Sequence, residues 1–91
     1  AVINIGRRST NDVVLRDPLI SRNHLQLRAK DGRFYLFDLD SKGGTKVNNN
    51  PANNVALEPG DVIQIGNTIL IYNQWIENTR SFSRYDDMGN L

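Results

Sequence analysis

Apolar and polar residues alternate along most of this chain, and the pattern repeats every two residues. Between residues 24 and 29, Leu25, Leu27 and Ala29 fall on one face, while the polar residues between them fall on the other. This is the period of a β-strand with one buried face, and no segment shows the period of a helix. The pattern predicts eight short strands, at residues 1–5, 12–15, 24–29, 34–39, 45–48, 55–57, 62–65 and 68–72.

Turn-forming residues separate these strands. Asp31-Gly32 is the strongest short signal for a β-hairpin, and Gly66-Asn67 suits the two-residue turn that begins with Gly. Pro59-Gly60 occupies the two central positions of a type II turn. Asp17-Pro18 and residues 49–51 are further turn candidates. Short strands with turn signals about every eight to twelve residues predict an all-β fold, a sandwich of two antiparallel sheets with loops clustered at its ends.

The length of the chain, 91 residues, fits one small domain. We assign residues 1–73 to the sandwich and residues 74–91 to a polar tail, ordered only where Trp75 packs back. The absence of Cys excludes disulfides and thiolate metal sites, and it fits a reducing compartment. No apolar run approaches the roughly twenty residues of a membrane span. We therefore expect a cytoplasmic location, as the cytoplasmic part of a larger and even membrane-anchored protein.

The charge of the chain is nearly balanced, with eleven basic and ten acidic residues and a net charge of +1. This balance gives no broad positive field for nucleic acid, and no aromatic stripe is present on which bases could stack. Eight of the eleven basic residues are Arg, which suits forked contacts with phosphate or carboxylate. The basic side chains therefore act locally.

A candidate anion site begins in the loop before the third predicted strand, at residues 21–24. There the Ser21 hydroxyl and the Arg22 guanidinium stand beside the only histidine of the chain. Arg7 follows the first strand, and Lys42 lies in a glycine-rich loop after the fourth. If these loops meet at one end of the sandwich, their donors suit a phosphorylated side chain, which carries a charge of about −1.5 to −2 and three acceptor oxygens.

Each of these residues also has a purely structural interpretation. Arg7 can be a solvated charge at a strand end, and Ser21 can be a turn hydroxyl that bonds nearby backbone. Gly43-Gly44 can be a flexible turn, or it can let a peptide approach the backbone closely. We interpret His24 as structural because no second His and no Cys is present to share a metal. No metal and no cofactor are expected.

Four short motifs occur in order along the chain: Gly6-Arg7, Ser21-Arg22-Asn23-His24, residues 41–48 and residues 59–66. In their order and spacing they resemble the successive motifs of forkhead-associated (FHA) domains, across residues 2–72. This resemblance implies a β-sandwich of eleven strands that binds phosphothreonine peptides through loops at one end.

The resemblance also implies roles for single residues. The phosphate contacts of the family fall on Arg7, Ser21 and Arg22, and the peptide is held by Lys42 and Gly43. The structural support of the site falls on Gly6, His24, Gly44, Thr45 and Asn48, with His24 bracing the binding loop from within. The family commonly has Asn where Gly43 stands, and the Asn amide holds the peptide backbone. The family also receives the threonine methyl in a small pocket, which implies weaker binding of phosphoserine.

These observations favour a phosphothreonine-dependent protein- or peptide-binding module of a larger signalling or scaffold protein. The isolated domain is expected to be a monomer, without nucleic acid and without direct membrane contact. The alternative is a degenerate domain of the same type that interacts or assembles without phosphate, for which Gly43 is the evidence. An enzyme is disfavoured, because Ser21 and His24 are three residues apart in an extended segment and point to opposite faces. No Gly-x-Ser-x-Gly turn surrounds Ser21.

Overall fold

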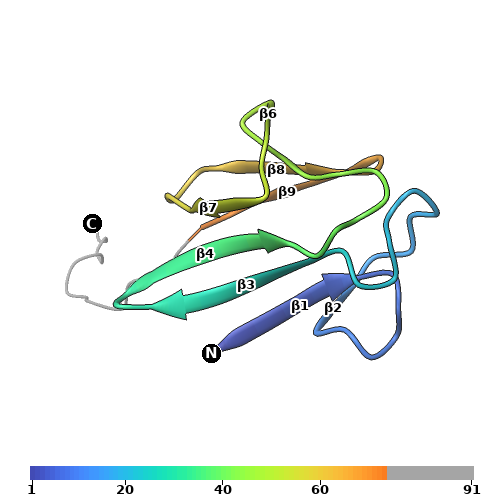
Figure 1. Cartoon of the computed structure of the whole chain (residues 1–91), viewed down its shortest axis with the longest axis horizontal. Helices are drawn as coiled ribbons and strands as arrows, with labels where there is room; N and C mark the ends of the chain where they lie inside the picture. The colour runs from blue at the N-terminus through green and yellow to red at the C-terminus, as the bar shows by residue number, and fades with distance from the viewer. Residues whose placement is uncertain (74–91) are drawn as a thin grey trace, which may run out of the picture.

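The computed structural model describes residues 1–73, which form strands and loops without a helix (Figure 1). The described part of the chain contains nine strands: β1 (Val2–Gly6), β2 (Val13–Val14), β3 (Leu25–Lys30), β4 (Arg33–Asp38), β5 (Lys46–Val47), β6 (Asn50–Pro51), β7 (Asn54–Ala56), β8 (Val62–Ile65) and β9 (Thr68–Ile71). None of these residues forms a helix long and apolar enough to cross a membrane. The tail predicted for residues 74–91, and with it the packing expected of Trp75, lies outside the described residues.

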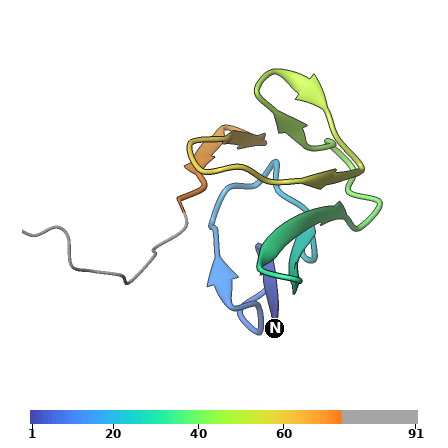
Figure 2. The same cartoon turned by 90° about the vertical axis from the view of Figure 1, so that its left-hand side faces the viewer.

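The strands form two sheets that face each other, as Figure 2 shows. The five-stranded sheet has the order β2-β1-β3-β4-β7, and the four-stranded sheet has the order β6-β5-β8-β9. The predicted all-β sandwich is therefore confirmed. All eight predicted strands are present within two residues of their expected bounds, and β6 is additional.

One pairing differs from the antiparallel sandwich expected, because β2 runs parallel to β1 with Ile5 opposite Val13. The link between the two strands is short for a parallel connection. The Asn11 side chain closes this link by donating to the carbonyl oxygens of Arg8, at 2.9 Å, and Arg22, at 2.7 Å. A parallel pair held by side-chain contacts of this kind carries no periodic signal in the sequence.

The predicted turns have the backbone that their residues favour. Asp31 and Gly32 both have positive φ angles, 54° and 78°, as a type I′ hairpin requires. Gly66 has a φ of 55° at the first position of the β8–β9 turn, as predicted for a hairpin that begins with Gly. The turn predicted at residues 49–51 is shifted by one residue. Asn48 and Asn49 take the positive φ angles, 51° and 70°, and this tight turn allows residues 50–51 to pair as β6.

The core lies between the two sheets. Its buried members come from both sheets and from two connections: Ile5, Ile20, Leu25, Leu27, Leu36, Val47, Leu57, Ile63 and Ile65. Burying each side chain of this size contributes about 1.5–3 kcal/mol. The alternation predicted for β3 is confirmed at Leu25 and Leu27, whereas Ala29 is exposed beside the hairpin turn.

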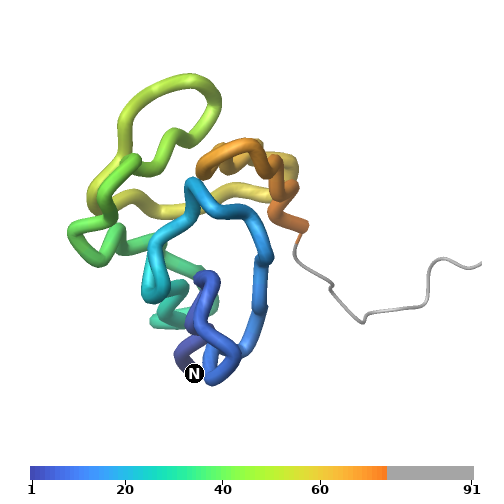
Figure 3. The backbone as a smooth tube through the Cα atoms, turned by 90° about the vertical axis from the view of Figure 1, so that its right-hand side faces the viewer, coloured from blue at the N-terminus to red at the C-terminus, as the bar shows by residue number. Residues whose placement is uncertain are grey.

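Four loops gather at one end of the sandwich because of the way in which the strands pair. Ile5 lies opposite Leu25, and Leu25 lies opposite Asp38, so the chain leaves β1, enters β3 and leaves β4 at the same end. Lys46 begins β5, directly after the loop that leaves β4, and it pairs with Gln64 near the end of β8. The β8–β9 turn therefore lies at this end too. The loop end is on the right in Figure 1 and faces the viewer in Figure 3.

Candidate functional site

The first two sequence motifs lie against each other at the loop end. The Arg7 amide donates to the Ser21 carbonyl at 3.0 Å, and the Arg8 amide donates to the Arg22 carbonyl at 3.1 Å. Gly6 is buried between these segments, and a Cβ added to it would lie 2.2 Å from the Arg22 carbonyl oxygen. Only Gly permits this approach, so Gly6 allows the loop that carries Ser21 to reach Arg7.

Arg7 is exposed but held in place. Its Nε donates to the carbonyl oxygen of Ile20 at 2.9 Å. One edge of the planar guanidinium is thereby anchored to the neighbouring loop, and the terminal Nη1 and Nη2 groups have no partner among residues 1–73. A guanidinium fixed in this way is prepared to bind an anion with little further loss of side-chain freedom.

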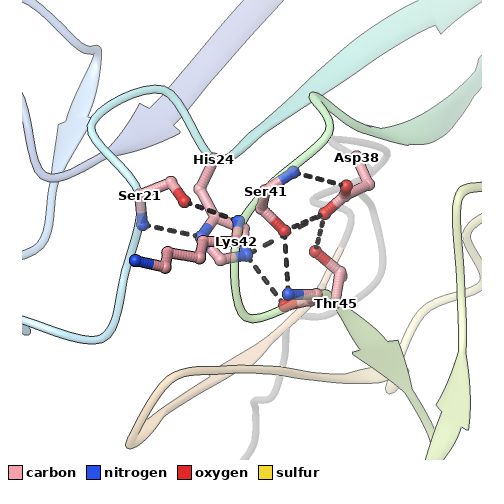
Figure 4. A network of polar contacts seen from close by, with 7 residues as sticks. Ser21, His24, Asp38, Ser41, Lys42 and Thr45 are labelled. Atoms are coloured by element: carbon pink, nitrogen blue, oxygen red, sulfur yellow. Dashed lines mark hydrogen bonds and ion pairs between the residues drawn. The ribbon is translucent and has the colours of Figure 1, made fainter.

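The Ser21 hydroxyl joins two loops. Its Oγ accepts a hydrogen bond from the Lys42 amide at 2.9 Å (Figure 4). Because a lone pair of Oγ is used by this amide, the hydroxyl hydrogen is available to donate to another group. The same contact brings the loop of Lys42 beside that of Ser21, as the prediction of a shared site required.

His24 is completely buried and links three segments. The Ser21 amide donates to its Nδ1 at 3.0 Å, so this nitrogen carries no hydrogen. Its Nε2 therefore carries the hydrogen and donates to the Gly44 carbonyl at 2.9 Å. His24 fixes both loops from below, as its predicted structural role implies. The imidazole contacts the amide of Ser21 and makes no hydrogen bond with the hydroxyl.

Asp38 continues this network on the other side of His24. Its carboxylate accepts hydrogen bonds from the Ser41 hydroxyl at 2.6 Å, the Ser41 amide at 2.9 Å and the Thr45 hydroxyl at 2.6 Å. The Ser41 hydroxyl oxygen in turn accepts the Gly44 amide at 3.0 Å. Burial alone would raise the pKa of Asp38, but the hydrogen bonds from the hydroxyls of Ser41 and Thr45 and from the Ser41 amide lower it below its usual value. Figure 4 shows how these groups hold the loop at residues 39–45.

Asp17 lies in the β2–β3 loop, which also carries Ser21, and it connects this loop with the β8–β9 turn. Its carboxylate accepts hydrogen bonds from the Leu19 amide at 2.9 Å, the Asn67 amide at 2.6 Å and the Thr68 hydroxyl at 2.9 Å. The bond from the Leu19 amide, followed by those from Thr68 and Asn67, lowers the pKa of Asp17 against a smaller opposing effect of burial. A Cβ on Gly66 would lie 2.8 Å from this carboxylate, so Gly66 allows the turn to approach it.

These contacts surround a groove of about 610 Å³ at the loop end, which we call the loop groove. Its lining comes from four loops and two strands: Arg7, Pro18, Leu19, Ile20, Ser21, Lys42, Gly43, Gly44, Lys46, Gln64 and Gly66. Three of these residues are cationic, and none is a carboxylate. The Ser21 hydroxyl and the free edge of the Arg7 guanidinium are therefore available to an anion, with the loop of Lys42 beside them.

The structure brings together most of the site residues predicted from the sequence. Arg7, Ser21, Lys42, Gly43 and Gly44 all line the loop groove. The buried Gly6, His24 and Thr45 lie behind it in the contacts described above. Two residues lie elsewhere: the exposed side chain of Arg22 is not part of the lining, and Asn48 bonds with Asp61 and Val62.

Several residues that build the site were not predicted from the sequence. Asp17 was interpreted only as part of a turn, and Asp38 only as part of a strand, although each holds a loop that lines the groove. Lys46 and Gln64 pair across β5 and β8 and extend the groove beyond the loops. The alternation of exposed and buried residues in these strands places both side chains outward, but their closeness to Arg7 follows only from the fold. No cluster of three potential metal ligands occurs within residues 1–73.

Comparison with known proteins identifies a shared domain. A sequence model of the FHA domain matches residues 3–66. The oxoglutarate dehydrogenase inhibitor of Corynebacterium diphtheriae is 40% identical over 67 residues, which are 74% of this chain and 47% of that protein. The chain thus spans about half the length of this curated relative.

Solved structures resemble this fold over most of its length. The FhaA FHA domain, complexed with the intracellular domain of Rv3910, has a TM-score of 0.76 and 38% identity, over 78% of each chain. An FHA domain from a structural and functional analysis of phosphothreonine-dependent FHA domain interactions has a TM-score of 0.80 and 36% identity, over 84% of this chain and 79% of that one.

Proposed function

This chain belongs to the FHA family, and we propose that it binds phosphothreonine-containing proteins or peptides through the loop groove. One observation carries the proposal: the anchored guanidinium of Arg7 and the hydroxyl of Ser21 border one groove, together with Lys42. A phosphate with three acceptor oxygens matches this set of donors. The phosphothreonine-dependent interactions studied with the similar FHA domain support the same ligand.

The energetics of this site suit a phosphate-dependent interaction. A hydrogen bond to a charged group contributes about 1.5–3 kcal/mol. Three such bonds would separate a phosphorylated from an unphosphorylated peptide by several kcal/mol, whereas micromolar binding requires only about −8 kcal/mol in total. The phosphate would therefore dominate the affinity, and the peptide on either side of it would adjust the affinity.

Arg22 has a weaker part in this proposal than the sequence resemblance implied. Its carbonyl oxygen is bonded by the Arg8 amide and the Asn11 side chain, which fixes its backbone away from the groove lining. Its guanidinium is exposed and can contribute at longer range. We assign the direct phosphate contacts to Arg7 and Ser21 and the peptide contacts to Lys42 and Gly43.

The alternative function is a phosphate-independent interaction or assembly, and Gly43 is the observation that favours it. Gly43 lines the groove at the position where the family commonly has Asn, so one peptide-holding amide is missing. An enzymatic use of Ser21 and His24 has less support, because the buried His24 ring bonds the Ser21 amide in place of its hydroxyl. A general base must reach the proton that it abstracts.

We further propose that this domain belongs to a longer signalling or scaffold protein, in the cytoplasm, and that it acts as a monomer. The relative from Corynebacterium diphtheriae, which is about twice as long as the matched region and is named as an inhibitor, supports a regulatory context.

The test is a calorimetric titration of this domain with one peptide in three forms. The peptide is first selected from an oriented phosphothreonine library, and it is then compared with its threonine and phosphoserine forms. We expect micromolar binding of the phosphothreonine form, weaker binding of phosphoserine and no measurable binding of threonine. Equal affinities for the phosphorylated and unphosphorylated forms would favour the phosphate-independent alternative.

A further inference from the structure

Two cationic side chains lie on different sides of the proposed phosphate position and have no partner within residues 1–73. Lys46 lines the loop groove, beyond Gly43 and Gly44. Arg16 lines a second hollow of about 460 Å³, which we call the Arg16 hollow, together with Arg7 and Pro18. The two hollows share only Arg7 and Pro18, so these two residues border both hollows, while Lys46 lines one of them and Arg16 the other.

The position of Lys46 is fixed by the sheet. It is exposed between the buried residues Thr45 and Val47, and its Cα pairs with that of Gln64 in β8. Its aliphatic stem therefore lies on the outer face of the four-stranded sheet at the edge of the groove, while its ammonium extends into solvent. No hydrogen bond or ion pair holds this ammonium in the described part of the chain.

The position of Arg16 is fixed by its neighbours in the chain. Leu15 donates its amide to the Gly6 carbonyl at 3.0 Å, and Asp17 is bonded to the β8–β9 turn. Arg16 is thus held between two anchored residues, with its own side chain exposed beside Arg7. The guanidinium of Arg16 likewise has no acidic partner within residues 1–73.

The charge around these hollows is uncompensated locally, although the whole chain is nearly neutral. Neither lining contains a carboxylate. Asp17 follows Arg16 in the chain, but its carboxylate oxygens already accept three hydrogen bonds. Cations in this arrangement attract negative charge on a bound partner and disfavour positive charge there.

We infer that this domain selects phosphothreonine segments that carry acidic residues on both sides of the phosphothreonine, with Lys46 reading one flank and Arg16 the other. This inference rests on the proposed function. An extended peptide rises about 3.3 Å per residue, so each cation can reach a carboxylate a few residues from the phosphate. Exposed ion pairs of this kind are weak, and each acidic flank should improve affinity about two- to fivefold.

The test uses four phosphothreonine peptides, one with neutral flanks, one with Glu residues before the phosphothreonine, one with Glu residues after it, and one with Lys on both sides. Binding is measured by fluorescence anisotropy at low and moderate salt. We expect both acidic peptides to bind more tightly than the neutral peptide and the Lys peptide to bind more weakly. Added salt should reduce these differences.

Variants assign each preference to one residue. Lys46→Ala should remove the advantage of one acidic peptide and leave the other, and Arg16→Ala should do the reverse. Lys46→Glu should bring the Lys peptide at least to the affinity of the neutral one. Lys30→Ala is the matched control, because it removes the same charge at the β3–β4 turn, at the other end of β3 from the groove, and should change neither preference.

The outcomes separate this inference from the proposed function. If the neutral phosphothreonine peptide binds and the acidic peptides bind no better, the inference is wrong and the proposed function stands. If Lys30→Ala reduces the acidic preference as much as Lys46→Ala and Arg16→Ala, the preference comes from diffuse charge and the inference is also wrong. If no phosphopeptide of the series or of the library binds, the proposed function fails together with it.

Discussion

At the level of single residues, the proposed phosphate recognition depends most on the Arg7 side chain. It is exposed, and its only side-chain hydrogen bond within residues 1–73 is to the Ile20 carbonyl. Arg7→Ala should therefore leave the fold intact and weaken phosphopeptide binding by about 2–5 kcal/mol, since removing the guanidinium leaves the phosphate charge without a hydrogen-bonded partner. Calorimetry measures the loss, and thermal unfolding checks the fold. Arg8→Ala is the control, because its exposed side chain lines neither hollow, and an equal loss there would contradict a specific role for Arg7.

Gly43 offers a gain-of-function test. Its φ angle is outside the left-handed region, unlike the 82° of Gly44, and an added Cβ would meet only the Leu19 carbonyl at 3.5 Å. An Asn side chain is therefore compatible with this backbone. Gly43→Asn should tighten phosphopeptide binding by about 1 kcal/mol, the net contribution of one neutral hydrogen bond. Unchanged or weaker binding by a folded variant would mean that the loop contacts the peptide differently from other family members.

At the level of strands and turns, substitutions of two glycines with positive φ angles separate the stability of a turn from the support of the loop groove. An added Cβ on Gly32, whose φ is 78°, would meet no heavy atom within 4 Å, whereas one on Gly66 would strike the Asp17 carboxylate at 2.8 Å. Gly32→Ala should cost about 1–2 kcal/mol of unfolding free energy, from its left-handed conformation alone. Gly66→Ala should cost more unfolding free energy and also weaken phosphopeptide binding, because the added methyl group displaces the Asp17 carboxylate that supports Leu19. Urea unfolding and calorimetry measure both effects, and a binding loss in Gly32→Ala would contradict this distinction.

The strands and turns also show what the sequence could predict. Hairpins at Asp31-Gly32 and Gly66-Asn67 were predicted because each depends on the conformations that its own residues allow. Strand β6 was missed because Asn48 and Asn49 are less specific for a tight turn than Asn-Gly. The parallel pairing of β1 with β2 was missed because contacts between distant segments determine it, such as that of Asn11 with Arg22.

The candidate site was predictable to a similar extent. Arg7, Ser21 and Lys42 were recognisable because phosphate recognition needs their particular functional groups. The support from Asp17 was not, because two of its three partners lie 50 and 51 residues away and any carboxylate in a turn looks the same in sequence. Arg22 remains a prediction, since its motif position suggests a direct contact while its exposed side chain is not part of the groove lining.

At the level of the whole molecule, two carboxylates behind the loop groove make the free energy of unfolding depend on pH. Asp17 and Asp38 both have folded-state pKa values below the ordinary value of 3.8, so the folded state favours their charged forms. Their contribution to stability is complete above about pH 4 and is lost as the pH falls through the folded-state values.

Urea unfolding at pH 6 and pH 3 measures this dependence. We expect a lower free energy of unfolding at pH 3 in the wild type. Asp38→Asn should be less stable than the wild type at pH 6, because the carboxylate accepts three hydrogen bonds, and should lose less on acidification. An identical pH dependence in the variant and the wild type would exclude Asp38 as a contributor.

If the loop groove binds a phosphate dianion, phosphorus NMR of a bound phosphothreonine peptide will reveal it. The second pKa of the free phosphate is about 6. If Arg7 and its neighbours stabilise the dianion, that pKa must fall in the complex, and affinity must be highest above about pH 7 and decrease towards pH 5. We therefore predict that the phosphorus signal of the bound peptide titrates at lower pH than that of the free peptide, and that Arg7→Ala reduces this difference. A bound phosphate that titrates at the same pH as the free peptide would contradict the account.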